Sequence, residues 1–534
     1  MKKVVLTLLI VVAVAVLALA EWTGNSGDQK ISYFPGTTGD FLSRFPKIVA
    51  YDNGILYSAW LQGKTLVPYE VCFSKSTDNG RTWNGSAQDF MISANDGEGS
   101  LVSGERPLDM AISSTGDVFI VWAESLTNVG HEIMLLRSTD GGTTWDGSSS
   151  DFSISFGGGP RALEPAIAVD INDNLHVVWH QRPNTDTTEI LYGFSSDNGV
   201  TWTSQMADRV ISYPDGAHAN YPEIAVDVLN NVYVVWAERV DPTDINSASI
   251  HYGKLNSGDT QFNCELADYT TALPHRSATT PQIAIGPDNS IHVVFEGRND
   301  IGGSFKGAIY YSKSVDGGVN WTGLVSETFV DRDAMDDTTA SDPTVTVTSQ
   351  GDIAVSYCNF DLSSLGQTET RLSLSFDGGA TWTGNTTGEE IVGHWEETGD
   401  DRPGYNPHMC LSAGDTLHVV WNEDCMDEGG SSGYYEIMYS RGDTLGTPGG
   451  GPECAFVPGD GNGNGICNGL DVTYMVNYLK GGPNPPPIVC NCPSPLFPGA
   501  DANGNCTFNG LDVTYLVNFL KGGPNGPAGC STCL

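Results

Sequence analysis

The sequence predicts an all-β fold of the β-propeller class, followed by a small α-helical module near the C-terminus. Two observations carry this prediction. A phrase of the form Ser-x-Asp-x-Gly-x-(Thr/Asn)-Trp occurs five times, within a longer β-rich repeat of roughly sixty residues. Towards the end of the chain, two Asp/Asn/Gly-rich loops about forty residues apart each run into a segment with apolar residues at helical spacing.

The first twenty residues have the features of a secretory signal peptide. Met1-Lys2-Lys3 precedes an apolar run from Val4 to Ala20, and the sequence turns polar at Glu21. An uncleaved anchor is the alternative, because the run is close to the minimum length that spans a bilayer. No second apolar run is long enough to cross. We therefore expect residues 1–20 to be removed and the mature chain to be secreted, extracellular and free of the membrane.

The composition restricts the partners. Lys and Arg number 25 against 65 Asp and Glu, which gives a net charge of −40. Such a surface repels phosphate backbones and anionic lipids, so nucleic-acid and membrane-surface partners are excluded, whereas cation binding is favoured. The 12 cysteines of an exported chain predict disulfides rather than reactive thiols, with the pairing left open.

Each long repeat begins with a proline and contains four short β-rich runs. Four strands repeated around a ring are typical of a β-propeller, which we expect over residues 21–445. An open stack of sheets is the alternative, but it would leave unprotected strand edges. The sequence contains seven such openings, at Pro46, Pro107, Pro165, Pro222, Pro281, Pro343 and Pro407.

The seventh repeat lacks a fourth run of its own. The segment Gln29–Gly36 precedes the first repeat and is similar to Arg209–Asp215, a fourth run. We therefore predict that the N-terminal strand completes the last blade beside Tyr435–Ser440 and closes a seven-bladed ring, which removes the open edge.

The five-fold phrase predicts a hairpin turn, because Asp-Asn-Gly or Asp-Gly-Gly supplies the positive φ that the turn needs. The Asp carboxylate accepts hydrogen bonds from the turn backbone. The phrase resembles the Asp-box of the BNR repeats found in sialidases, sortilin-like receptors and several glycoside hydrolases. This resemblance implies a structural role, on the face away from an active site, for Asp78, Asp140, Asp197, Asp316 and Asp377.

The opposite face would receive the loops that follow each second run, and these loops are charged. Glycoside hydrolysis needs two carboxylates roughly 5–10 Å apart, and the candidates are Glu124, Glu238, Glu296 and Glu423. Arginines that could pair with an anionic or polyhydroxylated ligand are Arg182, Arg239 and Arg298. A solvated polar rim is the alternative for each of them.

Arg44-Phe45-Pro46 resembles the Arg-Ile-Pro motif that opens the first blade of sialidases, and this resemblance implies Arg44 as a substrate arginine. The chain departs from that family in having seven repeats instead of six. No segment matches the family's Asp acid/base loop or its nucleophilic Tyr. Whether the propeller is an enzyme, and then a glycoside hydrolase, therefore stays open.

A Gly/Pro-rich linker, residues 446–455, leads to a module over residues 456–534 whose two loops have EF-hand ligand spacing. The predicted Ca²⁺ ligands of the first loop are Asp460, Asn462, Asn464, Ile466 through its carbonyl, Asn468 and Asp471. Those of the second are Asp501, Asn503, Asn505, Thr507 through its carbonyl, Asn509 and Asp512. Loop followed by helix, duplicated, resembles a type I dockerin, which implies docking onto a cohesin-like module of a scaffold or cell surface.

Three functions are compatible with these patterns. The first is a secreted, calcium-dependent docking protein whose propeller recognises an extracellular glycan or surface ligand, within a polysaccharide-processing assembly. The second is a glycoside hydrolase, sialidase-like or otherwise, that is delivered by its dockerin. The third is a protein–protein scaffold. The residues favour binding slightly over hydrolysis.

Overall fold

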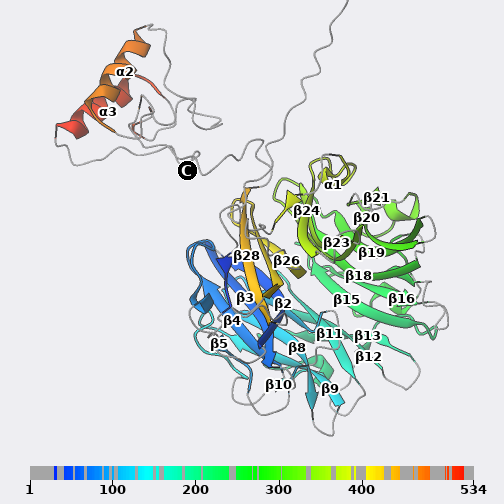
Figure 1. Ribbon diagram of the computed structural model, residues 1–534. Coiled ribbons are helices and arrows are strands. Elements are labelled where there is room, and N and C mark those ends of the chain that lie inside the picture. Colours follow the sequence, from blue (N-terminus) through cyan, green and yellow to red (C-terminus); the bar gives the residue numbers. More distant parts are fainter. Residues whose placement is uncertain are drawn as a thin grey trace, which may run out of the picture. The chain divides into compact units, whose positions relative to one another are not determined.

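The computed structural model describes the strands of the propeller region and the helices of the C-terminal region (Figure 1). The residues that it describes are 29–32, 41–51, 54–64, 69–86, 90–94, 99–100, 106–126, 130–147, 152–155, 161–182, 187–205, 209–239, 248–266, 269–272, 276–301, 304–326, 328–331, 338–361, 368–386, 390–392, 404–425, 434–444, 461, 467–480, 500, 502–503 and 508–521. The predicted signal peptide and linker lie outside these residues.

The chain divides into two compact parts, with the division between Gly446 and Thr447. The described residues of the N-terminal part are β-strands, short 3₁₀ turns and one four-residue helix, α1 (Thr383–Thr386). The all-β prediction is therefore confirmed for this part. The C-terminal part contains two longer helices.

Each repeat forms an antiparallel ladder in chain order. Repeats one to three comprise β2 (Phe41–Tyr51), β3 (Ile55–Lys64), β4 (Glu70–Ser76) and β5 (Phe90–Met91); β7 (Leu108–Ile112), β8 (Val118–Leu126), β9 (Gly130–Ser138) and β10 (Phe152–Ser153), with β6 (Gly99–Ser100) also on β8; and β11 (Ala162–Val169), β12 (Leu175–Gln181), β13 (Glu189–Ser195) and β14 (Arg209–Val210).

The later repeats follow the same order. They comprise β15 (His218–Val226), β16 (Val232–Arg239) and β17 (Ala248–Leu255); β18 (Arg276–Ile285), β19 (Ile291–Ile301), β20 (Ser304–Ser314) and β21 (Thr328–Phe329); β22 (Thr338–Val347), β23 (Ile353–Asp361), β24 (Thr368–Ser375) and β25 (Glu390–Ile391); and β26 (Gly404–Ser412), β27 (Thr416–Cys425) and β28 (Tyr434–Thr444).

The first strands of successive repeats lie side by side, as Figure 1 shows. Contacts run from β2 through β7, β11, β15, β18, β22 and β26 and return from β26 to β2. A single parallel pairing, Leu42 with Tyr435, also joins β2 to β28. Sheets that contact one another in this cyclic order give a propeller-like arrangement around a common centre.

The N-terminal strand β1 (Gln29–Lys30) pairs antiparallel with β28, placing Gln29 opposite Tyr439. The amide N–H of Ile437 donates to Ser32 Oγ at 2.9 Å. A serine makes this same contact after the fourth strands of the first three repeats, for example from Ile190 N to Ser212 Oγ at 3.0 Å. Residues 29–32 thus occupy the position of a fourth strand, and the pairing predicted for the N-terminal segment is confirmed.

The core lies between neighbouring sheets because the second strand of each repeat is apolar on both faces. A tryptophan near the end of this strand is almost completely buried in five repeats, as Trp60, Trp122, Trp179, Trp236 and Trp421. Cys264, Cys358 and Cys410 are free thiols, each on a different repeat. Six of the seven cysteines after residue 430 lie outside the described residues, so the expected disulfides stay a prediction.

The C-terminal part contains α2 (Gly469–Leu479) and α3 (Gly510–Leu520), as the apolar spacing predicts. Met475 and Leu516 pack together with Ala500 and Ala502 in a small core. Asn468 and Asn509 cap the two helices: each side chain accepts from the backbone N–H two residues on, at 2.8 Å. Within the described part of the chain, no helix has the length and apolar character needed to span a membrane.

Candidate functional site

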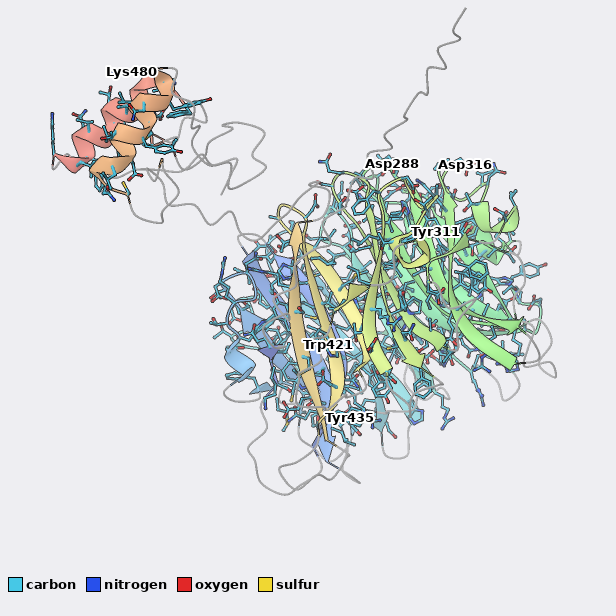
Figure 2. The ribbon with its side chains drawn as sticks, turned by 45° about the horizontal axis from the view of Figure 1, so that its top comes forward. Asp288, Tyr311, Asp316, Trp421, Tyr435 and Lys480 are labelled. Atoms are coloured by element: carbon cyan, nitrogen blue, oxygen red, sulfur yellow. The ribbon has the colours of Figure 1, made fainter. Side chains whose placement is uncertain are left out.

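The two faces of the propeller carry different turns because successive strands run in opposite directions. Turns that join first to second strands and third to fourth strands share one face, and all five Asp-box turns lie there. Figure 2 shows Asp288 and Asp316 at this end of the molecule and Tyr435 at the other. The ends of second strands and the starts of first and third strands form the opposite face, called here the open face.

The Asp-box carboxylates are used within their own turns. In the second repeat, Asp140 Oδ1 accepts from the backbone N–H groups of Thr143 and Thr144 at 3.0 and 2.9 Å, and from Ser138 Oγ at 2.9 Å. Hydrogen bonds from Thr144 and Ser138 lower the pKa of Asp140 to about 2. The pKa values of Asp197 and Asp316 also fall to about 2 through bonds inside their turns. These contacts give the carboxylates a structural role.

The candidate carboxylates lie within strands and not in loops, contrary to our expectation, because each second strand continues past its tryptophan. Trp236 Nε1 donates to Glu238 Oε2 at 2.9 Å, and Trp421 Nε1 donates to Glu423 Oε2 at 3.1 Å. The same bond reaches a glutamine in two other repeats, from Trp60 to Gln62 and from Trp179 to Gln181. These carboxylates therefore serve as indole acceptors, a role that neutral amides fill equally well.

The other candidate carboxylates occupy different surroundings. Glu124 matches Glu238 in position and has no solvent exposure. Glu296 directly follows Phe295, one position earlier than the others relative to the aromatic residue, and is half-buried. Because side chains alternate along a strand, Glu296 points to the other side of its sheet. The four candidate glutamates therefore do not occupy one equivalent position in their repeats.

A Ser–His–Glu chain also includes Glu238. Ser249 Oγ lies 2.7 Å from His251 Nε2, and His251 Nδ1 lies 3.5 Å from Glu238 Oε1. Ser249, His251 and Glu238 are 4%, 1% and 2% exposed. A substrate therefore has almost no access to the hydroxyl, and the chain acts as a buried polar connection between strands.

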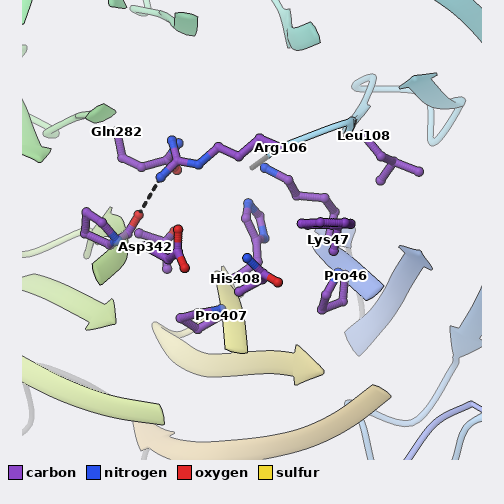
Figure 3. A pocket seen from close by; sticks show the side chains of 12 residues that line it. Pro46, Lys47, Arg106, Leu108, Gln282, Asp342, Pro407 and His408 are labelled. Carbon is purple, nitrogen blue, oxygen red and sulfur yellow. Dashed lines mark hydrogen bonds between the residues drawn. The ribbon is translucent and has the colours of Figure 1, made fainter. Parts of the chain in front are cut away.

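Charged residues also fill the centre of the ring (Figure 3). Arg106 Nη1 donates to the Pro281 carbonyl at 2.7 Å, and Nη2 donates to the carbonyls of Thr280 and Pro343 at 3.0 and 3.2 Å. Its Nη1 also lies 4.0 Å from Glu223 Oε2. One guanidinium thus joins backbone groups of two later repeats to the second.

Burial shifts the pKa values of two of the central groups. Burial raises the pKa of Asp342. Burial, together with nearby Lys47 and Arg106, holds the pKa of His408 well below its usual range. The cavity among these groups measures about 30 Å³, which is room for a water or two and not for a sugar. These groups therefore hold the inner strands together, and the cavity among them is too small to be a glycan site.

The prolines that open the repeats sit at β-bulges. In six of the first strands, the residue before the proline has positive φ, between 46° and 57°, and the strand register shifts there. The bulge turns the next side chain towards the centre. One sequence signal was missed, a polar residue next to each of these prolines. An inner strand buried among apolar neighbours has no need of a polar side chain there, so its presence indicates a central polar cluster. The examples are Lys47, Glu223, Gln282, Asp342 and His408.

Cationic groups gather on the open face between the third and fourth repeats. Arg182 is exposed at the end of β12, and Arg239 is the last residue of β16, paired with His218 in the ladder. The backbone N–H of Thr188 donates to His218 Nδ1 at 3.3 Å and links the two repeats. Burial, with added repulsion from Arg182 and Arg239, lowers the pKa of His218. We call Arg182, His218 and Arg239 the arginine–histidine cluster.

The pair His180 and Glu164 lies on the same two repeats. His180 Nδ1 is 3.0 Å from Glu164 Oε2, which also accepts from Tyr221 N at 3.2 Å. Both side chains are buried. The pair fixes the first strands of the two repeats beside the arginine–histidine cluster.

The remaining predicted arginines lie apart from this cluster. Arg298 is exposed on β19 of the fifth repeat. Arg44 on β2 places its guanidinium carbon 4.4 Å from the ring centre of Tyr435. Burial raises the pKa of Tyr69, while nearby Arg44 opposes that rise. Arg44 therefore belongs to an aromatic cluster between the seventh and first repeats.

Five of the predicted calcium ligands lie among the described residues: Asn468, Asp471, Asn503, Asn509 and Asp512. Asp471 and Asp512 are fully buried, and each accepts through Oδ2 from the backbone of its helix cap, at 2.7 and 2.8 Å. Asn503 N donates to Asp512 Oδ1 at 3.3 Å, which brings the start of the second loop to its end. The other predicted ligands, Asp460, Asn462, Asn464, Ile466, Asp501, Asn505 and Thr507, lie outside the described residues.

No protein-family model and no curated protein matches the chain. Among solved structures, it is similar to an ulvan lyase with 13% identity and a TM-score of 0.49, covering 75% of this chain and 94% of that one. An α-L-arabinanase from Penicillium chrysogenum has 14% identity and a TM-score of 0.42, covering 64% and 94%. A Hadza microbial sialidase has 15% identity and a TM-score of 0.41, covering 72% and 73%.

Proposed function

We propose that the N-terminal part binds an acidic glycan on its open face, without turning it over. The observation that carries this proposal is the arginine–histidine cluster. On a chain with a net charge of −40, two arginines placed around one histidine form a local site of opposite sign. Guanidinium groups pair with carboxylate or sulfate oxygens through two parallel hydrogen bonds, which suits an acidic sugar.

The lowered pKa of His218 supports the same ligand. A neutral imidazole at pH 7 has one donor and one acceptor nitrogen. Thr188 N already donates to Nδ1, so Nε2 carries the proton and is the donor that remains for a sugar hydroxyl. The cluster therefore combines charge recognition by Arg182 and Arg239 with hydroxyl recognition by His218.

Binding is favoured over hydrolysis by the state of the carboxylates. Glu238 and Glu423 already accept indole N–H bonds, and Glu124 is fully buried. A glycoside hydrolase is the second candidate, favoured by Arg44 stacked on Tyr435. A tyrosine beside an arginine is chemistry suited to an acidic sugar, as in the sialidases that the Arg44 motif resembles.

We further propose seven blades, with β1 completing the last of them. The cyclic contacts of the first strands and the pairing of Gln29 with Tyr439 support this count. A closed ring leaves no strand edge exposed to other chains. It also brings the third and fourth repeats into the fixed geometry that the cluster needs.

For the C-terminal part we propose a dockerin-like, calcium-dependent docking module on a secreted protein, with a cohesin-like partner. Carboxylate, amide and carbonyl oxygens are the ligands that Ca²⁺ takes. Asn468, Asp471, Asn503, Asn509 and Asp512 would hold it, with the other loop residues. Bound Ca²⁺ would neutralise the buried Asp471 and Asp512 and so stabilise the helices. Calorimetry of the full chain tests this: EDTA should lower the transition of the C-terminal part and leave that of the propeller unchanged.

The glycan proposal is tested by affinity electrophoresis of the full chain in gels containing polygalacturonate, dextran sulfate or neutral dextran. The acidic polymers should retard the protein and the neutral one should not. Replacing both Arg182 and Arg239 by Ala should abolish the retardation, while the matched replacement of Arg81 and Arg137, at the other face, should preserve it. Equal retardation of both double variants would refute the site.

A further inference from the structure

The fourth repeat has lost the Asp-box, and its turn differs from the others in consequence. Leu255 pairs with Val232 as Ser195 pairs with Leu175, so Leu255 stands where intact turns begin with Ser. By the same alignment, Ser257 replaces the turn's Asp, and Phe262 replaces its Trp. The carboxylate that draws the intact turns together is therefore missing here.

Gly258 of the altered turn has more open surroundings than the matching glycine of an intact turn. In intact turns the backbone lies close to the preceding repeat: a Cβ added at Gly318 would come within 2.7 Å of the Tyr252 ring, and one at Gly317 within 3.0 Å of Lys254 Nζ. At Gly258, which matches Gly317, an added Cβ would meet nothing within 4 Å. The third repeat carries Phe194 where the fourth carries Lys254, so no lysine side chain reaches the turn here.

A pocket of about 530 Å³ lies between this turn and the third repeat, within the range of small-ligand sites. Tyr192 and Phe194 of the third repeat line it. Phe262 is fully buried and packs against Tyr192 with ring centres 5.1 Å apart. Although the Phe262 ring is smaller than the Trp of an intact repeat, it fills the core beneath the pocket. The turn 256–259 forms one wall, and the turn 170–174 of the third repeat forms another.

Two charged groups of the pocket, Arg209 and Asp170, are already held by other protein groups. Arg209 forms an ion pair with Glu265 and donates to the Thr260 carbonyl at 2.9 Å. Asp170 accepts from Asn172 N at 2.8 Å, and from the backbone and side-chain nitrogens of Asn174 at 2.9 and 2.8 Å. An anionic ligand would therefore find the guanidinium of Arg209 occupied.

What remains for a ligand is amide, hydroxyl and aromatic surface. Asn172, Asn256 and Ser257 are exposed, and Phe194 is half-buried beside them. Amides supply both donors and acceptors to hydroxyl groups, and an aromatic ring covers the apolar face of a sugar. We infer that this pocket, on the Asp-box face, is a second carbohydrate site that binds a neutral mono- or disaccharide.

The test titrates the full chain, by isothermal calorimetry, with cellobiose, xylobiose and digalacturonate. A neutral disaccharide should bind, and Ser257→Trp, which fills the pocket from its exposed turn, should weaken that binding by about tenfold or more. The matched control is Val319→Trp, on the exposed turn of the fifth repeat, where the residue is 75% exposed; this variant should bind as the parent does. Thermal unfolding confirms that both variants are folded.

The variant with Arg182 and Arg239 both replaced by Ala separates this site from the acidic-glycan site. It should lose acidic polymers and retain the neutral disaccharide. The inference is overturned if neither neutral disaccharide binds, if Ser257→Trp binds as the parent does, or if the double arginine variant loses neutral binding as well.

Discussion

Lys47 Nζ lies 3.2 Å from Asp109 Oδ1, and both side chains are more than nine-tenths buried. The two residues belong to the first strands of neighbouring repeats. Asp109 also accepts from Ile167 N of the third repeat at 2.9 Å. This ion pair therefore links three successive repeats at the centre of the ring.

Breaking the pair should strongly destabilise the propeller. Lys47→Met leaves the Asp109 carboxylate buried without its cation, which is expected to cost about 3–5 kcal/mol in the free energy of unfolding. Urea denaturation followed by tryptophan fluorescence measures this change. Adding Asp109→Asn removes the stranded charge and keeps an acceptor for Ile167 N, so the double variant should recover much of the loss. A double variant less stable than the single one would contradict this role.

The strands were predictable because their signals are local and repeated. Alternating turns, β-rich runs and a proline at each opening gave the repeats, and the similarity of Gln29–Gly36 to a fourth run gave the pairing with β28. The extension of the second strands past Trp236 and Trp421 was not predictable. The charged residues that follow these tryptophans are typical of loops, whereas in the structure Glu238 and Glu423 lie within the strands and accept indole N–H bonds.

Ser32 should stabilise the propeller as much as its counterparts in complete repeats do. Ser32→Ala leaves the buried N–H of Ile437 without its acceptor, a loss of about 1–3 kcal/mol. Ser212→Ala removes the same contact from Ile190 N in the third repeat. Chemical denaturation should therefore give similar changes for the two variants. If Ser32→Ala is neutral while Ser212→Ala is not, the N-terminal segment does not complete the seventh repeat.

The Asp-box carboxylates should make stability depend on acidity. The pKa of Asp140 is about 2 in the folded protein against an ordinary value of 3.8, so its contribution is fully present above the ordinary value. That contribution is lost as the pH falls from 3.8 through 2. Melting temperatures measured between pH 5 and pH 2 should fall, less steeply for Asp140→Asn than for the parent. Identical pH profiles would show that the turn bonds do not favour the ionised form.

Glu238 should tolerate replacement by glutamine, because Gln62 and Gln181 accept the same indole bond elsewhere in the chain. Glu238→Gln should keep the melting temperature and the retardation by acidic polymers. Glu238→Ala should lower the unfolding free energy by about 1–3 kcal/mol, since Trp236 Nε1 loses its acceptor. If Glu238→Gln instead abolished a glycosidase activity, the carboxylate would be catalytic and not structural.

The functional residues were only partly predictable from their neighbours in sequence. Arg182 and Arg239 were identified from their places after apolar runs, and the fold brings them to the same histidine. Arg298 came from the same reasoning and Arg44 from a motif resemblance, and both lie on other repeats. The central groups, such as Lys47 and Asp342, were missed because each depends on a bulge that only the register between strands reveals.

The most direct test of binding without turnover follows both quantities in one sample. The full chain, with calcium, is incubated with polygalacturonate, sialyl-lactose and dextran sulfate, and bound polymer and released sugar are measured together. The account predicts retention of at least one acidic ligand, no release, and loss of retention when Arg182 and Arg239 are replaced by Ala. Release of sugar that disappears in Arg44→Ala but persists in that double variant would contradict it.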